Sequence, residues 1–176
     1  MPLLLHGYFR SSAAYRVRIA LNLKELDHDT VSVHLRSGEQ RAPGFLALNP
    51  QGLVPALLHD DKVITQSSAI LEYLDEAFPA TARLLPSLPR ERARVRALAA
   101  IVCCDVHPLD NLRVLNYIQE TLGQDEAAMV TWYNHWIHLG FQALESMLGN
   151  DPLTGAFCHG DTPGLADICL IPQIFN

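Results

Sequence analysis

The sequence predicts an α/β domain followed by an all-helical domain. Short apolar runs and alternating runs, both typical of strands, occur only before Pro89. After Pro89, apolar residues recur at helical spacing instead. A proline-rich segment of low regularity separates the two patterns and is typical of a domain boundary. We therefore expect domains at residues 1–80 and 90–176, joined by a linker at residues 81–89.

The chain is predicted to begin with a β-α-β unit. Leu3–Tyr8 is a short apolar run, as expected for a buried strand. A helix follows, and its buried stripe is predicted to consist of Ala13, Val17, Ala20 and Leu21. The basic residues off that stripe are Arg16, Arg18 and Lys24. From His28 to Leu35, apolar residues alternate with polar ones, which predicts a second strand. Strands joined through a helix in this way are normally parallel.

The rest of the α/β domain is predicted to be a hairpin and a helix. A brief helical turn at residues 44–48 precedes a strand at Leu53–Leu58. A tight turn and a strand at Lys62–Thr65 complete the hairpin. A helix follows Gln66, with a serine available to cap it. Its inner face is predicted to consist of Ile70, Leu71, Leu74 and Phe78. The order β-α-β followed by β-β-α is that of a thioredoxin-like domain.

Four helices are predicted after the linker. The first carries an apolar stripe of Val95, Leu98, Ala99, Val102 and Val106. Pro108 should kink or break this helix, because proline has no N–H to donate. Helical spacing also covers residues 114–122 and 130–148. The last helix is predicted to start at Gly164, with Asp167 in its first turn complementing the helix dipole.

Composition excludes several classes of protein. A net charge of −6 argues against a general nucleic-acid binder, which normally carries a basic face. No apolar segment reaches membrane-spanning length, and the first residues lack the positive region of a signal peptide. We therefore expect a cytoplasmic protein with reduced thiols and no nucleic-acid or membrane partner. Cys103, Cys104, Asp105 and His107 lack a paired C-x-x-C spacing, so no metal site is predicted.

The start of the first helix is the candidate site. Ser11 and Ser12 are both candidates for its N-cap. Hydroxyls, backbone N–H groups and the positive end of the helix dipole would converge there, which suits an anion or a thiolate. The alternative is that the two serines merely cap a core helix.

Four motifs, in order, resemble the zeta class of glutathione transferases. They are S-S-x-x-[WY]-R-V-R-I-A-L at Ser11–Leu21, N-P-x-x-x-V-P at Asn49–Pro55, Q-S-x-A-I-x-E-Y-L at Gln66–Leu74 and A-D-x-C-L-x-P-Q at Ala166–Gln173. The family includes maleylacetoacetate isomerase and maleylpyruvate isomerase, and residues 94–111 look especially like the bacterial maleylpyruvate isomerases. The resemblance implies a thioredoxin-like domain followed by a glutathione-transferase-type helical domain.

The resemblance also implies how glutathione binds. Ser11 would stabilise the glutathione thiolate, and Val54 would pair with the peptide backbone before a cis Pro55. Gln66 and Ser67 would hold the γ-glutamyl carboxylate and amine, and Ser67 at a helix N-terminus suits a carboxylate. Further glutathione-binding residues would be Ser12, Gln51, Pro55 and, from the helical domain, Asn111. An ordinary trans proline is the alternative at Pro55.

The activity implied is glutathione-dependent cis–trans isomerisation of a maleyl-type diketo acid, in aromatic-compound catabolism, by a homodimer. Such chemistry needs positive groups near the carboxylates of the substrate and the developing enolate. The candidates are Arg10, His107 and Arg113. Each has an alternative: Arg10 as a solvated loop charge, His107 as a surface or satisfied core histidine, and Arg113 as a surface ion-pair member.

Three departures from the family pattern stand out. Many zeta-class enzymes carry a cysteine directly after the paired serines, where this chain has Ala13. Leu112 stands where a further arginine is expected in the maleylpyruvate isomerase branch. The sequence ends at Asn176, where the family continues through more helix, so we expect the helical domain to be incomplete relative to the family. Two other functions stay open: a conjugating transferase acting on halo acids or other electrophiles, and a non-catalytic glutathione-binding or interaction protein.

Overall fold

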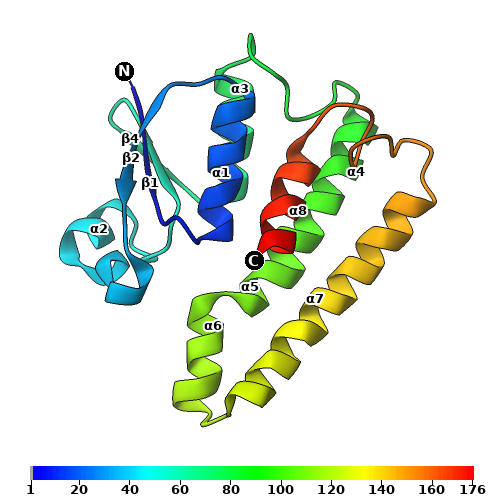
Figure 1. Cartoon of the computed structure of the whole chain (residues 1–176). Coiled ribbons are helices and arrows are strands. Elements are labelled where there is room, and N and C mark those ends of the chain that lie inside the picture. The colour runs from blue at the N-terminus through cyan, green and yellow to red at the C-terminus, as the bar shows by residue number, and fades with distance from the viewer. Residues whose placement is uncertain (1) are drawn as a thin grey trace. The chain divides into compact units, whose positions relative to one another are not determined.

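The computed structural model describes residues 2–176, which form two compact units (Figure 1). One unit comprises the chain up to Pro86 together with Ile174–Asn176, and the other comprises Ser87–Gln173. The break after Pro86 falls inside the segment 81–89 that was predicted as a linker.

The first unit is a four-stranded sheet with helices on its faces. Its elements are β1 (Leu3–Gly7), α1 (Ser12–Leu23), β2 (His28–Ser32), η1 (Leu35–Ser37), η2 (Glu39–Arg41), α2 (Pro43–Leu48), β3 (Ala56–His59), β4 (Lys62–Thr65) and α3 (Ser67–Ala77). The strand order is β2-β1-β3-β4, in which β1 is parallel to β2 and antiparallel to β3. Figure 1 shows α1 and α3 side by side against the sheet. The predicted thioredoxin-like topology is confirmed.

Both faces of the central strand β3 are covered. Ala56 and Leu57 point to opposite faces of the sheet, and both are fully buried. The helical side is filled by seven fully buried residues of α1 and α3, namely Ala14, Val17, Ala20, Leu21, Ile70, Leu71 and Leu74. On the other side a second cluster consists of Tyr8, Val33, Phe45, Val54 and Ala56, with Leu35 and Leu48 packed against it. The chain that leads into β3 is therefore held in a core.

Two basic residues that were predicted to lie off the buried stripe of α1 are instead buried. Lys24 and Arg16 are each only 2% exposed. The Lys24 Nζ donates to the Ala82 carbonyl at 2.8 Å and lies 3.6 Å from Asp75 Oδ1. The Leu84 N–H donates to the same carboxylate oxygen at 2.7 Å. Helical spacing missed this burial because it registers apolar faces and not the partners that allow a charge to be buried.

Two strands are shorter than predicted, each for a local reason. β2 ends at Ser32, because the His34 ring accepts a hydrogen bond from the Ser37 N–H and begins a 3₁₀ turn. β3 begins only at Ala56, directly after Pro55, which has no N–H for a strand ladder. The predicted inner face of α3 is confirmed for Ile70, Leu71 and Leu74, which are fully buried.

The second unit is helical, as predicted. Its elements are α4 (Pro89–Ala100), η3 (Ile101–Val106), α5 (His107–Asp110), α6 (Leu112–Asn116), η4 (Tyr117–Thr121), α7 (Glu126–Gly149) and α8 (Leu165–Phe175). The break expected at Pro108 is spread over a longer stretch. α4 first widens into the π-helical segment η3, where the His107 N–H donates five residues back to Val102, and α5 then restarts. Pro108 lies in the first turn of α5, where its missing N–H costs nothing.

The apolar stripe predicted for the first helix of this unit is confirmed. Val95, Leu98, Ala99, Val102 and Val106 are all buried. The pattern predicted for α7 is less well matched: Leu144 is buried, but Val130 is 46% exposed. Tyr133, Ile137 and Phe141, which belong to the same pattern, are half-buried.

Polar contacts fasten the loop between α7 and α8. Arg94 of α4 donates to Asp151 Oδ2 at 2.6 Å, to the Cys158 carbonyl at 2.7 Å and to Thr154 Oγ1 at 2.8 Å. At the start of α8, the Gly164 N–H donates to Asp167 Oδ2 at 2.9 Å. The predicted helix start at Gly164 is therefore confirmed, and the Asp167 carboxylate satisfies an N–H that the helix leaves unpaired.

None of the helices found in residues 2–176 combines the length and the apolar composition needed to cross a lipid bilayer.

Close packing between α7 and η3 requires the glycine at position 140. A Cβ atom at Gly140 would overlap Val106 Cγ2, whereas a Cβ at Gly149 of the same helix would meet nothing. We predict that Gly140→Ala lowers the free energy of unfolding by about 1–3 kcal/mol, despite the better helix propensity of alanine. Gly149→Ala is the matched control and should be neutral or stabilising by up to about 1 kcal/mol. Thermal and urea unfolding measure both, and equal stability of the two variants would contradict this packing constraint.

Candidate functional site

Ser11 is the N-cap of α1. Its Oγ accepts a hydrogen bond from the Ala14 N–H at 3.2 Å, and Ser12 is the first helical residue and is buried. The sequence left both serines as candidates for the cap, and the structure selects Ser11. A hydroxyl that accepts through a lone pair still has its proton to donate. Half-buried Ser11 can therefore donate to an acceptor placed beyond the end of the helix.

The turn that precedes Ser11 is fastened from inside α1. The Ser11 N–H donates to the Tyr8 carbonyl at 3.0 Å, and the Arg18 guanidinium donates to the carbonyls of Tyr8 and Phe9 at 3.4 and 3.1 Å. Arg10 lies in this turn with its side chain exposed. Arg10 is thus the cation that stands next to the Ser11 hydroxyl in the chain.

The loop before β3 contains the predicted cis peptide bond, between Val54 and Pro55. The Asn49 side chain shapes this loop by donating to the Leu53 carbonyl at 2.7 Å and accepting from the Gln51 N–H at 3.2 Å. Val54 is buried, yet its N–H and C=O have no hydrogen-bond partner among residues 2–176. Buried main-chain groups are nearly always paired, so these two suit the backbone of a bound peptide.

Gln66 and Gln51 are brought together at the start of α3. Gln66 has a φ of +69°, and its Nε2 donates to Gln51 Oε1 at 2.7 Å. The prediction that a serine caps this helix is wrong. Gln66 occupies the N-cap position and makes no side-chain cap bond. The buried Ser67 hydroxyl instead accepts from Arg16 Nη1 at 3.2 Å, so it is engaged across the two helices and not within α3.

Arg16 was predicted to lie off the buried stripe of α1. It is instead buried against Ser67, and no carboxylate lies within ion-pair distance of its guanidinium in the part of the chain that the structure describes. Its Nε and Nη2 atoms have no hydrogen-bond partner there either.

The three candidates of the helical unit lie close together in the chain. His107, at the start of α5, is half-buried, and its Nδ1 lies 3.3 Å from Gln173 Oε1. Asn111 caps α6: its Oδ1 accepts from the Arg113 N–H at 3.1 Å and its Nδ2 donates to the Pro108 carbonyl at 2.6 Å. Each polar atom of the Asn111 side chain thus makes one hydrogen bond within the fold, which leaves one hydrogen on Nδ2 and one lone pair on Oδ1. The Arg113 side chain is exposed.

Asp110 was missed by the sequence analysis. It is 4% exposed, and neither carboxylate oxygen has a hydrogen-bond partner within residues 2–176. Burial raises the pKa of Asp110 from 3.8 to about 7. The only signal in the sequence was an acidic residue one position before the cap of α6, which does not indicate burial.

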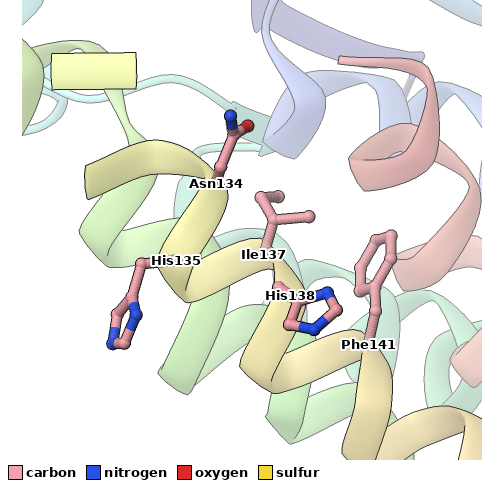
Figure 2. Close-up of a pocket in the computed structure, with 5 residues that line it drawn as sticks. All are labelled: Asn134, His135, Ile137, His138 and Phe141. Carbon is pink, nitrogen blue, oxygen red and sulfur yellow. The ribbon is translucent and has the colours of Figure 1, made fainter. Parts of the chain in front are cut away.

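A shallow hollow on α7 contains none of the predicted site residues. Its lining residues are Asn134, His135, Ile137, His138 and Phe141. Figure 2 shows that the His135 side chain points to the other side of the helix from Ile137 and Phe141. The hollow is therefore a stretch of open helix surface with no converging polar groups.

All four cysteines, Cys103, Cys104, Cys158 and Cys169, belong to the helical unit. Burial, and to a lesser extent the Asp167 carboxylate, raises the pKa of the Cys158 thiol to about 12. Cys158 is therefore protonated at neutral pH. Within residues 2–176 no group of three or more His, Cys, Asp or Glu side chains is arranged to hold a metal ion.

The fold and the α1 site define the class of protein. Residues 10–77 match the family model of the glutathione S-transferase N-terminal domain. A solved structure described as the holo form of maleylpyruvate isomerase, a bacterial zeta-class glutathione S-transferase, superposes with a TM-score of 0.95 at 49% identity, covering 98% of this chain and 81% of that one. The chain is a glutathione S-transferase by fold.

Relatives with high sequence identity show to which class of glutathione S-transferases the chain belongs. The chain is 51% identical over 172 residues to the maleylacetoacetate isomerase of Rhizobium meliloti, covering 98% of this chain and 80% of that protein. The maleylacetoacetate isomerase of Methylobacterium extorquens AM1, solved with bound malonate and GSH, superposes with a TM-score of 0.94 at 45% identity, covering 98% of this chain and 80% of that one. The chain belongs to the zeta-class family of maleylacetoacetate and maleylpyruvate isomerases.

The buried Asp110 should make stability depend on pH. Between about pH 4 and about pH 7 the unfolded chain has lost a proton that the folded chain keeps, so stability falls as the pH rises through this range. We predict that Asp110→Asn, which removes the titration, raises the melting temperature more at pH 8 than at pH 5. Asp105 is exposed and provides the control, since Asp105→Asn should change the melting temperature at neither pH 5 nor pH 8. If Asp110→Asn has the same melting temperature as the unmodified protein at both pH values, Asp110 does not have the raised pKa.

Proposed function

We propose that this protein is a glutathione-dependent cis–trans isomerase of a maleyl-type diketo acid, maleylpyruvate or maleylacetoacetate. The observation that carries the proposal is its 51% identity, along nearly its whole length, to a maleylacetoacetate isomerase. The match of its structure to a holo maleylpyruvate isomerase supports the same reaction class. When bound, glutathione supplies the thiolate that adds to the double bond conjugated with a carbonyl, allows rotation and is then eliminated.

Ser11 is proposed to hold that thiolate. Its hydroxyl proton is available, because the Ala14 N–H occupies a lone pair of the oxygen and not the proton. A hydrogen bond to a charged group is worth about 1.5–3 kcal/mol, and about 1.4 kcal/mol corresponds to one pKa unit. Ser11 therefore lowers the thiol pKa of bound glutathione by about one to two. Since Ala13 replaces the cysteine found in many zeta-class enzymes, glutathione is the sulfur nucleophile of the proposed reaction.

The remaining glutathione contacts are proposed along the loop before β3 and the start of α3. The unpaired main chain of Val54, beside Pro55, fits the peptide backbone. Ser67 suits the γ-glutamyl carboxylate, because the α3 N-terminus presents N–H groups that no side chain caps. The bonded pair of Gln51 and Gln66 presents amides for the γ-glutamyl amine and carboxylate. Ser12, at the first position of α1, and Asn111 of the helical unit complete the proposed set.

Cations are proposed to serve the carboxylates of the substrate. Arg10 follows from its exposed position in the turn before Ser11. His107 and exposed Arg113 are the candidates of the helical unit. A dicarboxylate substrate is supported by the malonate bound to the Methylobacterium relative. These positive groups would stabilise negative charge that develops on the substrate.

We further propose that the protein is a cytoplasmic homodimer. The support for both statements is the resemblance to the family and not an interface or a targeting signal observed in this chain.

Conjugation is the second candidate function. The same activated thiolate can attack a halo acid or another electrophile and stay attached, and the similar maleylpyruvate isomerase is described as a glutathione S-transferase. Product analysis separates the two, because isomerisation regenerates glutathione and conjugation consumes it. A non-catalytic glutathione-binding protein would do neither.

A direct assay tests the leading proposal. Maleylpyruvate and maleylacetoacetate are incubated side by side with the protein, with glutathione or with S-methylglutathione, which has no free thiol. We expect at least one substrate to isomerise, with glutathione only and without loss of glutathione. No turnover of either substrate by folded protein would overturn the isomerase assignment, and a stable conjugate would favour the second candidate.

Substitution of Ser11 tests the thiolate role. We predict that Ser11→Ala lowers kcat/KM at neutral pH by about tenfold to a hundredfold, with partial recovery as the pH rises and glutathione ionises without help. The measurement is the pH profile of kcat/KM. Ser11→Thr keeps a hydroxyl and a cap and should retain most activity, while exposed Ser146→Ala should match the unmodified protein. An unchanged profile for Ser11→Ala would show that Ser11 does not stabilise the thiolate.

A further inference from the structure

Arg16 is a buried cation with too few partners. It is 2% exposed, and its single hydrogen bond runs from Nη1 to Ser67 Oγ at 3.2 Å. The Nε and Nη2 atoms are buried without a partner, and no carboxylate of residues 2–176 pairs with the guanidinium. Burying a charge without a counter-ion is costly. The position of Arg16 therefore indicates that a negatively charged ligand binds nearby in the functional state of the protein.

The place for that charge is the start of α3. The first hydrogen bond at this helix end runs from the Ile70 N–H to the Gln66 carbonyl, and the N–H groups of Ser67, Ser68 and Ala69 donate to no residue that the structure describes. Gln66 supplies no cap. Three free N–H groups at the positive end of an 11-residue helix, backed by a buried guanidinium, suit a carboxylate.

The bond from Arg16 also sets the direction of the Ser67 hydroxyl. Because Nη1 can only donate, the bond occupies a lone pair of Ser67 Oγ and leaves the hydroxyl proton for another acceptor. A serine hydroxyl can donate one hydrogen bond while it accepts others. The bond from Arg16 therefore orients the Ser67 hydroxyl so that its proton points away from the guanidinium and is available to an acceptor.

We propose that Arg16 is a positioning residue for the γ-glutamyl carboxylate of glutathione, acting through Ser67. It holds the Ser67 hydroxyl as a donor to that carboxylate and places a positive charge behind the free N–H groups of α3. The inference rests on the proposed glutathione site. Arg16 is too buried to be reached by substrate from solvent, so it affects binding and not the chemical step.

Two peptides separate this role from a merely structural one. Glutathione carries the γ-glutamyl carboxylate, and 4-aminobutyryl-cysteinyl-glycine is the same peptide without it. Arg16→Met and Ser67→Ala should each weaken glutathione binding by about tenfold to a hundredfold in calorimetric titrations. Neither should change the affinity for the decarboxylated peptide. In the double variant the two losses of binding free energy should add only in part, because Arg16 acts partly through Ser67 and partly through its own charge.

Steady-state kinetics provide a second readout. Arg16→Met should raise the KM for glutathione by about tenfold to a hundredfold, as for the binding affinity, and should leave kcat at saturating glutathione unchanged. Arg83→Met removes an exposed arginine of the same unit and should change neither constant. If Arg16→Met does not fold, Arg16→Lys keeps the buried charge with a less extended set of donors, and it should show a smaller loss, again for glutathione only.

The outcomes are distinct. If Arg16 variants weaken both peptides alike, Arg16 is structural and the proposal is wrong. If the unmodified protein binds glutathione and Arg16→Met binds it equally well, the positioning role fails while the proposed function stands. If the unmodified protein binds no glutathione, the proposed function fails and this inference fails with it.

Discussion

The hydrogen bond from Arg16 to Ser67 joins the two helices that carry the candidate glutathione site. Both helices need partners for the N–H groups at their first turn, and they meet this need differently. α1 is capped by Ser11, whose hydroxyl keeps its proton for use outside the helix. α3 has no side-chain cap, and its Ser67 hydroxyl is held by Arg16 of the neighbouring helix. One helix end thus suits a thiolate and the other a carboxylate, and glutathione contains both.

The loop between these helix ends completes the pattern. Val54 belongs to the buried cluster under α2, so the chain before β3 is held firmly, yet its main-chain N–H and C=O are left unpaired. A site of this kind binds a peptide through groups whose positions are set by the core and does not need to be ordered by the ligand. That arrangement lowers the entropic cost of binding.

The helical unit depends on a different set of constraints. Gly140 lets α7 approach η3 closely, and Arg94 and Asp167 fasten the loop that leads into α8. The stretch from His107 to Arg113 carries the candidate cations of this unit, and it follows the π-helical segment that precedes Pro108. Since the thiolate chemistry is common to isomerases and conjugating transferases, these cations are the groups we propose to select a dicarboxylate substrate.

Local rules were sufficient for much of this protein. Apolar periodicity predicted α4 and its buried stripe, and the hairpin followed from its turn. Each of these is determined by residues close together in the chain. The cis bond at Pro55 was instead implied by the resemblance of four motifs to the family, since the residues around Pro55 left an ordinary trans bond open. The burial of Arg16, Lys24 and Asp110 was decided only by the tertiary structure. Whether a charged side chain is buried depends on groups that lie far away in the sequence, such as Ser67 for Arg16 and Asp75 for Lys24. No helical spacing contains that information, because the partner and the low-dielectric surroundings exist only after the chain has folded.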